Sequence, residues 1–236
     1  MQKLAIFDFD STLISCDSSD TLSSYQLPNE IESLYNEFNW PTRMNACFKY
    51  LKQHFNINSN DIVAKLGSIQ IEKEMKHLIM SLKKENYKLL IISDSNKLFI
   101  ETILNQNNMI SYFDEIITNQ ATINQDQIIE IRPYLDQMNK LVACEYCAKL
   151  CARPSICKKS ILQDYISNND LFTKIVFVGD GDNDFCVSLI LNEDSYLFAK
   201  QNLALYNILE TNKDNKIRSK VFYWNNANDI YNYLFN

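Results

Sequence analysis

The chain has 236 residues, of which 46% are hydrophobic and 22% charged, and its formal net charge is −6. These values are typical of a globular protein with a sizeable core, and the acidic balance argues against a general nucleic-acid binder, which carries a basic face. The first apolar stretch is too short for a signal peptide, and no segment approaches the roughly 18 apolar residues of a membrane span. Seven cysteines without an export signal predict reduced thiols in a cytoplasmic protein.

Three short apolar runs predict buried parallel strands. They cover residues 4–7, 89–92 and 175–178, and each is followed by a polar turn and then a helical pattern. Runs without alternation are typical of strands that are covered on both faces. The order of elements therefore predicts an α/β protein with a doubly wound parallel sheet. A hairpin is expected around residues 122–131.

Between the first two runs, the alternation of strand and helix is interrupted. Residues such as Met44 and Phe48 share one helical face, and no convincing strand follows the first run until the second. We expect a small all-α cap at residues 16–72, inserted after the first strand. Residues 1–15 and 73–236 would then form the core.

Polar residues gather where the predicted strands end. In open parallel sheets, ligands bind in the crevice at this edge. The residues expected there are Asp8, Asp10, Thr12, Ser93, Asp94, Asp180, Asp182 and Asp184, with a cation from Lys158 or Lys159.

This set of residues suits phosphoryl transfer. Two carboxylates as near as those of Asp8 and Asp10 repel each other unless a cation lies between them. Mg²⁺ typically takes one or two carboxylates together with a substrate phosphate, and Asp180 can complete such a set. Asp8 could then attack phosphorus, while Ser93 and a lysine contact the phosphoryl oxygens.

Four motifs in the same order resemble those of haloacid dehalogenase (HAD) superfamily phosphatases. They are Asp8-Phe9-Asp10-Ser11-Thr12, Ile92-Ser93-Asp94, Lys158, and Gly179-Asp180-Gly181-Asp182-Asn183-Asp184. Further segments look like the PHOSPHO-type phosphatases, which include phosphoethanolamine/phosphocholine phosphatases and a pyridoxal phosphate phosphatase. These segments are Ser18-Ser19-Asp20-Thr21, Trp40 with Met44 and residues 48–51, residues 92–96, Cys157-Lys158-Lys159, and Asp184-Phe185-Cys186.

The resemblance implies a Rossmann-like HAD core with Mg²⁺-dependent hydrolysis of a small phosphomonoester. Asp8 would be the nucleophile that forms an aspartyl-phosphate, and Asp10 the general acid and then the general base. Asp8, Asp180 and the backbone carbonyl of Asp10 would bind Mg²⁺. Ser93 and Lys158 would complete the catalytic set.

The resemblance also assigns three acids around that set. Asp20 and Asp94 align with substrate-contact positions, and Asp184 would orient the lysine or metal-bound water. The segment from Asp10 to Asp20 is one residue longer than in the family, so Asp17 is an alternative to Asp20. Asp20 and Asp94 could also be ordinary residues at helix starts.

Other functions fit the residues less well. A receiver-like signalling domain would carry its phosphoaccepting Asp on the third strand of a shorter chain. A non-catalytic phosphate-binding module would be marked by loss of Asp8 or Asp10, and both are present. Phosphoserine and pyrophosphate are alternative substrates, although the cap motifs argue against phosphoserine. The expected partner is a small phosphate ester, with neither nucleic acid nor a membrane.

Four cysteines lie within 14 residues, at positions 144, 147, 151 and 157. Four thiols can hold Zn²⁺ tetrahedrally, and Cys144-x₂-Cys147 has the spacing of a zinc knuckle, but the later gaps of three and five residues are not standard. The sequence favours free thiols in an ordered loop, with zinc and a regulatory disulfide as alternatives.

Overall fold

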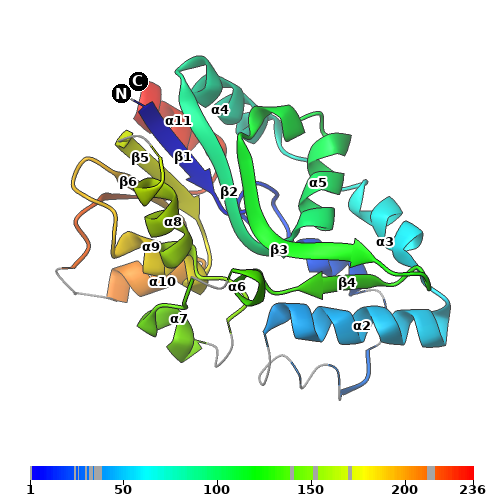
Figure 1. Cartoon of the computed structure of the whole chain (residues 1–236). Coiled ribbons are helices and arrows are strands. Elements are labelled where there is room, and N and C mark those ends of the chain that lie inside the picture. Colours follow the sequence, from blue (N-terminus) through cyan, green and yellow to red (C-terminus); the bar gives the residue numbers. More distant parts are fainter. Residues whose placement is uncertain are drawn as a thin grey trace.

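The computed structural model describes residues 2–23, 25, 27–29, 31, 34, 39–138, 141–150, 154–169, 172–211 and 216–236. Its centre is a seven-stranded sheet in the order β4-β3-β2-β1-β5-β6-β7 (Figure 1). The strands are β1 Gln2–Phe7, β2 Tyr87–Asn96, β3 Glu115–Ile123, β4 Ile129–Arg132, β5 Phe172–Gly179, β6 Tyr196–Lys200 and β7 Lys220–Trp224. All neighbouring pairs are parallel except β3 and β4, which form the expected hairpin. The predicted α/β class and parallel sheet are confirmed.

The described helices lie on both faces of the sheet and beyond its carboxyl edge (Figure 1). They are α2 Trp40–Phe55, α3 Ser59–Leu66, α4 Lys73–Lys84, α5 Lys97–Gln106, α6 Tyr134–Gln137, α7 Glu145–Leu150, α8 Lys158–Ser167, α9 Phe185–Ser188, α10 Ala204–Thr211 and α11 Ala227–Phe235. Three 3₁₀ turns complete the described elements: η1 Ser18–Leu22, η2 Ile110–Tyr112 and η3 Asp182–Asp184.

Two apolar cores explain why the central strands lack alternation. On β1, Ala5 and Phe7 pack into a core shared with α4, α5 and α11. Leu4 and Ile6 face the opposite core, which includes residues of α8, α9 and α10. Because both faces of β1 are buried, every position from Leu4 to Phe7 is apolar.

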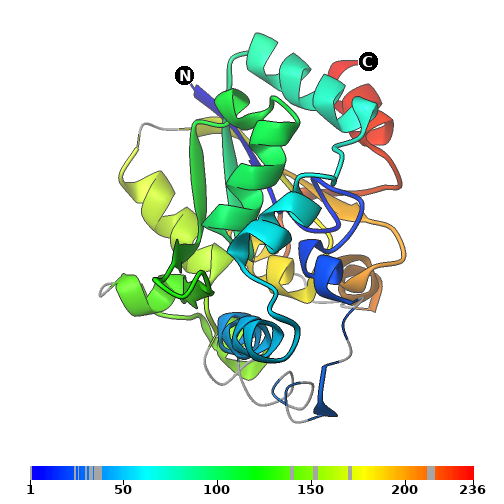
Figure 2. The ribbon, with the colours of Figure 1, turned by 90° about the vertical axis from the view of Figure 1, so that its right-hand side faces the viewer.

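The described elements between β1 and β2 are helical, as expected. Asn39 caps α2 by accepting a hydrogen bond from the Thr42 N–H at 3.1 Å, and a proline follows in the first turn. α2 lies along β4, beyond the carboxyl ends of β1 and β2 (Figures 1 and 2). The Asn45 amide donates to the Ile131 carbonyl and accepts from the Ile131 N–H, both at 2.7 Å. α2 is therefore bonded to the β3–β4 hairpin.

None of the helices within the described ranges has the length and apolar character that a bilayer crossing requires.

Candidate active site

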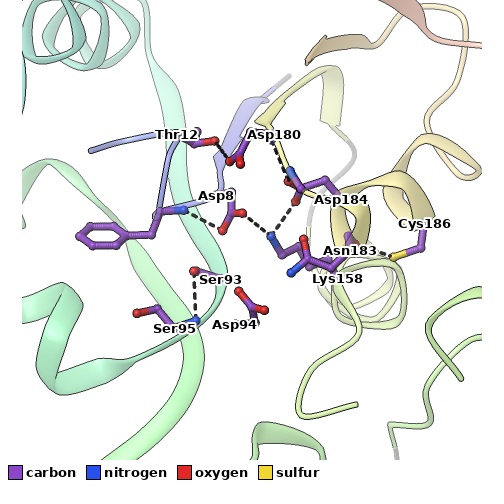
Figure 3. Close-up of polar contacts among 12 residues, drawn as sticks. Asp8, Thr12, Ser93, Asp94, Ser95, Lys158, Asp180, Asn183, Asp184 and Cys186 are labelled. Carbon is purple, nitrogen blue, oxygen red and sulfur yellow. Dashed lines mark hydrogen bonds and ion pairs between the residues drawn. The ribbon is translucent and has the colours of Figure 1, made fainter. Parts of the chain in front are cut away.

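Acidic residues from neighbouring strands meet at the carboxyl edge of the sheet. Asp8 follows β1, and its backbone N–H donates to the Val178 carbonyl of β5 at 2.9 Å. Asp180 follows β5, and Asp184 lies in η3 shortly after it. Carboxylate oxygens of Asp8, Asp180 and Asp184 lie within 4.8 Å of one another (Figure 3). The parallel order β2-β1-β5 thus gathers the expected motifs at one place.

Lys158 is the cation of this carboxylate cluster. Its ammonium lies 2.8 Å from Asp8 Oδ2 and 2.6 Å from Asp184 Oδ1, and the side chain is fully buried. Burial alone would lower the pKa of Lys158, but the carboxylates of Asp184, Asp8 and Asp94 raise it above its usual value. The lysine therefore stays charged. Lys159, the alternative cation, is partly exposed, and its backbone N–H donates a hydrogen bond to Cys186 Sγ at 3.3 Å.

Asp180 is the third carboxylate of the cluster. Its Oδ1 accepts a hydrogen bond of 2.6 Å from the Thr12 hydroxyl. Burial, with a further contribution from the Asp8 charge, raises the pKa of Asp180 to about 7. Such a shift records mainly the cost of holding a charged carboxylate away from water, to which the neighbouring charge of Asp8 adds.

Asp184 is held by the backbone as well as by Lys158. Its Oδ2 accepts hydrogen bonds from the N–H groups of Asp180 and Gly181, both at 2.9 Å. A Cβ atom on Gly179 would lie 2.5 Å from that oxygen, so only glycine allows this close approach. Both oxygens of Asp184 are therefore engaged, one by the lysine and the other by the loop backbone.

Asp10 faces η1. Its Oδ1 accepts from the Ser18 N–H at 2.7 Å. Burial and the nearby charge of Asp17 raise the pKa of Asp10 well above its usual value, against the opposing effect of the Ser18 hydrogen bond. A raised pKa favours the protonated form that a general acid needs.

The second strand contributes Ser93 and Asp94. Ser93 is buried, and its hydroxyl accepts from the Ser95 N–H at 3.3 Å. The pKa of Asp94 is raised to about 6 by burial and by Asp8, although Lys158 lowers it. Asn96, rather than Asp94, caps α5, so the interpretation of Asp94 as a helix cap is wrong.

Asp20 occupies a different environment. It is exposed on η1 and lines a pocket of about 200 Å³ with Arg43 and Met44 of α2. Asp17 is the N-cap of η1, and its carboxylate accepts from the Ser19 N–H at 2.8 Å and from the Ser19 hydroxyl at 2.7 Å. Asp17 is thus engaged in capping, and Asp20 faces a pocket that η1 shares with α2.

Sequence reasoning missed a second lysine near the site. Lys200, the last residue of β6, donates to the Ser11 carbonyl at 2.5 Å, and its charge lowers the pKa of Asp180. Ser11 itself has a left-handed backbone with φ of 54°. The run Leu197-Phe198-Ala199 before Lys200 was the available signal, because it marks another strand that ends at the same edge.

The thiol group differs from the expected one. Cys144, Cys147 and Cys157 come together with Cys186, which reaches them from α9, whereas Cys151 lies outside the described residues. The sulfur atoms of these four cysteines lie within 4.8 Å of one another.

The comparisons with known proteins agree with this geometry. A family model described as "Putative Phosphatase" matches residues 3–236. The chain belongs to this phosphatase family. Mouse "Pyridoxal phosphate phosphatase PHOSPHO2" is 27% identical to it, over 99% of this chain and 98% of the mouse protein. "Inorganic pyrophosphatase 2" of Arabidopsis thaliana is 28% identical, over 95% of this chain and 80% of that protein.

Solved structures show the fold of the phosphatase. A substrate-bound phosphoserine phosphatase complex has a TM-score of 0.64 at 16% identity and covers 99% of this chain and 98% of that chain. A phospho-aspartyl intermediate analogue of phosphoserine phosphatase has a TM-score of 0.58 at 18% identity, over 90% and 99% of the two chains. The phosphatase therefore has the HAD fold that its motifs implied.

Proposed function

We propose that this phosphatase hydrolyses a small phosphomonoester with Mg²⁺ through an aspartyl-phosphate on Asp8. The observation that carries the proposal is the buried ammonium of Lys158 between Asp8 and Asp184, with a carboxylate oxygen of Asp180 within 4.8 Å of theirs. This arrangement holds one carboxylate at the strand end and concentrates charges that suit a phosphate.

The donor set fits Mg²⁺. The carboxylates of Asp8 and Asp180 are hard oxygen ligands, and only Lys158 among the described residues forms an ion pair with the three clustered carboxylates, which leaves them with excess negative charge. Asp8, Asp180 and the backbone carbonyl of Asp10 would hold the ion, and Asp184 would remain with Lys158. When bound, Mg²⁺ supplies positive charge that offsets the repulsion between these carboxylates and a phosphate.

The protein's own groups account for both halves of the reaction. A carboxylate oxygen of Asp8 forms a bond to phosphorus as the bond from phosphorus to the leaving oxygen breaks, and protonated Asp10 gives its proton to that oxygen. Asp10 then takes a proton from water, which attacks the phosphorus and frees Asp8 and inorganic phosphate. Lys158 and Ser93 stabilise the negative charge on the phosphoryl oxygens.

The acids around the phosphate site favour a cationic leaving group. Asp94 contributes negative charge beside Lys158, and Asp20 adds an exposed carboxylate at the edge of the inserted helices. Carboxylates attract ammonium groups and repel anionic ones. Phosphoethanolamine and phosphocholine suit this field, and pyridoxal phosphate is the second candidate, supported by the name of the PHOSPHO2 relatives. Phosphoserine, which adds a carboxylate, is disfavoured.

A cytoplasmic location completes the proposal. The cysteines of the described residues are free thiols, which a reducing compartment maintains.

Turnover with Mg²⁺ against a panel of phosphate esters tests the proposal. The panel contains phosphoethanolamine, phosphocholine, pyridoxal phosphate, pyrophosphate and phosphoserine, and phosphate release is measured for each. Asp8→Asn keeps the shape of the side chain but cannot attack phosphorus, so it should abolish turnover. Asp126→Asn, at an exposed position in the β3–β4 turn, is the matched control and should turn over normally. Near wild-type turnover by Asp8→Asn would overturn the mechanism, and highest kcat/KM on phosphoserine would overturn the substrate class.

A further inference from the structure

We propose that Cys144, Cys147, Cys157 and Cys186 bind one structural Zn²⁺ ion. These cysteines come from three separate parts of the chain: the loop with α7, the residue before α8, and α9. Their sulfur atoms lie within 4.8 Å of one another. Four thiolates around Zn²⁺ at ~2.3 Å have sulfur–sulfur separations of roughly 3.8 Å, so small side-chain rotations suffice to close the site.

The surroundings of two sulfur atoms suit thiolates. Cys157 Sγ accepts from the Cys144 N–H at 3.4 Å and from the Ser160 hydroxyl at 3.2 Å. Cys186 Sγ accepts from the Lys159 N–H at 3.3 Å. Metal-binding groups are generally oriented by such outer hydrogen bonds, and here the donors also offset the negative charge of a four-thiolate site. In the thiol form, Cys186 donates to the Asn183 carbonyl at 3.4 Å, a contact that metal binding would replace.

Burial further supports a metal site. Cys147, Cys157 and Cys186 are buried and Cys144 is half-buried. The Tyr146 and Phe185 rings pack beside them with centroids 4.9 Å apart. A single disulfide joins only two sulfur atoms, so it would not account for the gathering of four. The soft sulfur donors select Zn²⁺ over Mg²⁺, which prefers oxygen.

The thiol site would anchor the segments that carry the active site. Cys157 directly precedes Lys158, and Asp184 lies two residues before Cys186. A Zn²⁺ bound to both cysteines would tie the start of α8 to η3 and α9, where the ammonium of Lys158 meets Asp184 at 2.6 Å. The four cysteines are therefore positioning residues, and their role does not depend on which phosphate ester is hydrolysed. On binding, the thiols release their protons to solvent.

Metal analysis of the full chain, purified without chelator and under reducing conditions, is the first test. Elemental analysis should find about one equivalent of zinc per chain, also after dialysis against excess Mg²⁺. The Cys144→Ser/Cys147→Ser variant should lose that zinc, whereas Cys47→Ser, at a buried thiol of α2, should keep it. Asp180→Asn should also keep it, which excludes the carboxylate cluster as the zinc ligand. Zinc near zero in folded wild-type protein, or zinc retained by the double variant, would overturn the proposal.

Cobalt substitution provides a spectroscopic test that begins with the wild-type protein. Wild-type protein refolded or exchanged with Co²⁺ should show the sulfur-to-metal charge-transfer and visible bands of a tetrahedral thiolate site. One equivalent of Zn²⁺ should abolish these bands, and excess Mg²⁺ should leave them. Cys186→Ser should weaken and shift them, because an oxygen or water replaces one sulfur. A spectrum of octahedral Co²⁺, or no change with Cys186→Ser, would contradict the assignment.

Discussion

The carboxylate cluster and the thiol cluster meet at the start of α8 and differ in their ligand atoms. One consists of Asp8, Asp180 and Asp184 around a lysine, and the other of four sulfur atoms. Lys158 and Cys157 are adjacent in the chain, yet each side chain enters a different cluster. Hard oxygen donors and soft sulfur donors select different ions, so two sites can share backbone segments without exchanging metals. In our two proposals, the carboxylate cluster carries the catalysis and the thiol cluster positions the catalytic groups.

The largest effect is expected when the lysine of the carboxylate cluster, Lys158, is removed. Lys158→Met would leave Asp8 and Asp184 buried without their cation, which costs about 3–5 kcal/mol in the free energy of unfolding. Urea unfolding measures the change. Lys159→Met is the matched control and should change stability by less than about 1 kcal/mol, since that residue is partly exposed. Equal losses in both variants would show that the buried ammonium does not hold the carboxylate cluster together.

Asp10→Asn tests the acid that faces η1. The amide cannot donate a proton to the leaving oxygen or accept one from water, so turnover should fall by roughly 10²-fold or more. With an aryl phosphate, whose leaving group needs no proton, acid quenching should trap the phosphorylated enzyme. Bound zinc should stay unchanged. Steady-state turnover equal to wild type would remove Asp10 from the reaction.

Mg²⁺ should stabilise the protein in a pH-dependent way. In the metal-free fold, the pKa of Asp180 is raised from 3.8 to about 7, so folded protein holds a proton that the unfolded chain has released. The free energy of unfolding of the metal-free protein therefore falls as the pH rises from 3.8 to about 7. Above this range the Asp180 carboxylate is ionised and available to Mg²⁺.

Thermal unfolding measures this effect. Saturating Mg²⁺ should raise the Tm by roughly 5–10 °C at pH 8 and by clearly less at pH 5. Asp180→Asn should abolish the pH dependence of the shift. A larger Mg²⁺ effect at pH 5 would contradict the sign of this linkage.

The smallest expected effect concerns the head group of the substrate. Asp94→Asn should raise KM for phosphoethanolamine relative to an aryl phosphate by the equivalent of about 1–3 kcal/mol, because Asp94 lies beside Lys158 in a desolvated place. Asp20→Asn should act in the same direction but more weakly, since Asp20 is exposed. Equal changes for the charged and neutral substrates would show that these acids do not recognise the head group.

The carboxylate cluster was predictable from the sequence because Asp8 and Asp180 directly follow apolar strand runs and Asp184 lies in the turn after the second of them. Asp8 and Asp180 occupy strand ends, and parallel pairing brings such ends together. Asp20 was harder to place, because its environment depends on how η1 meets α2. The strands β6 and β7 were missed, since their short runs lie toward the edge of the sheet and include partly exposed positions.

The thiol cluster could not be predicted as it stands. The local spacing suggested Cys151 as the partner of Cys144, Cys147 and Cys157. Cys186 is 29 residues beyond Cys157 in the sequence, and only the packing of α9 beside α8 brings it to the other sulfur atoms. Because strand β5 separates Cys157 from Cys186 in the chain, the four cysteines do not form a local spacing motif that the sequence could reveal.

The hydrogen bonds between Asn45 and Ile131 pair part of the free edge of β4. β4 is an edge strand, and an edge strand presents unpaired N–H and C=O groups that can recruit a strand from another molecule. The Asn45 amide satisfies both backbone groups of Ile131 as a neighbouring strand would, and α2 lies along the same edge. The inserted helix therefore also protects this border of the sheet against edge-to-edge aggregation.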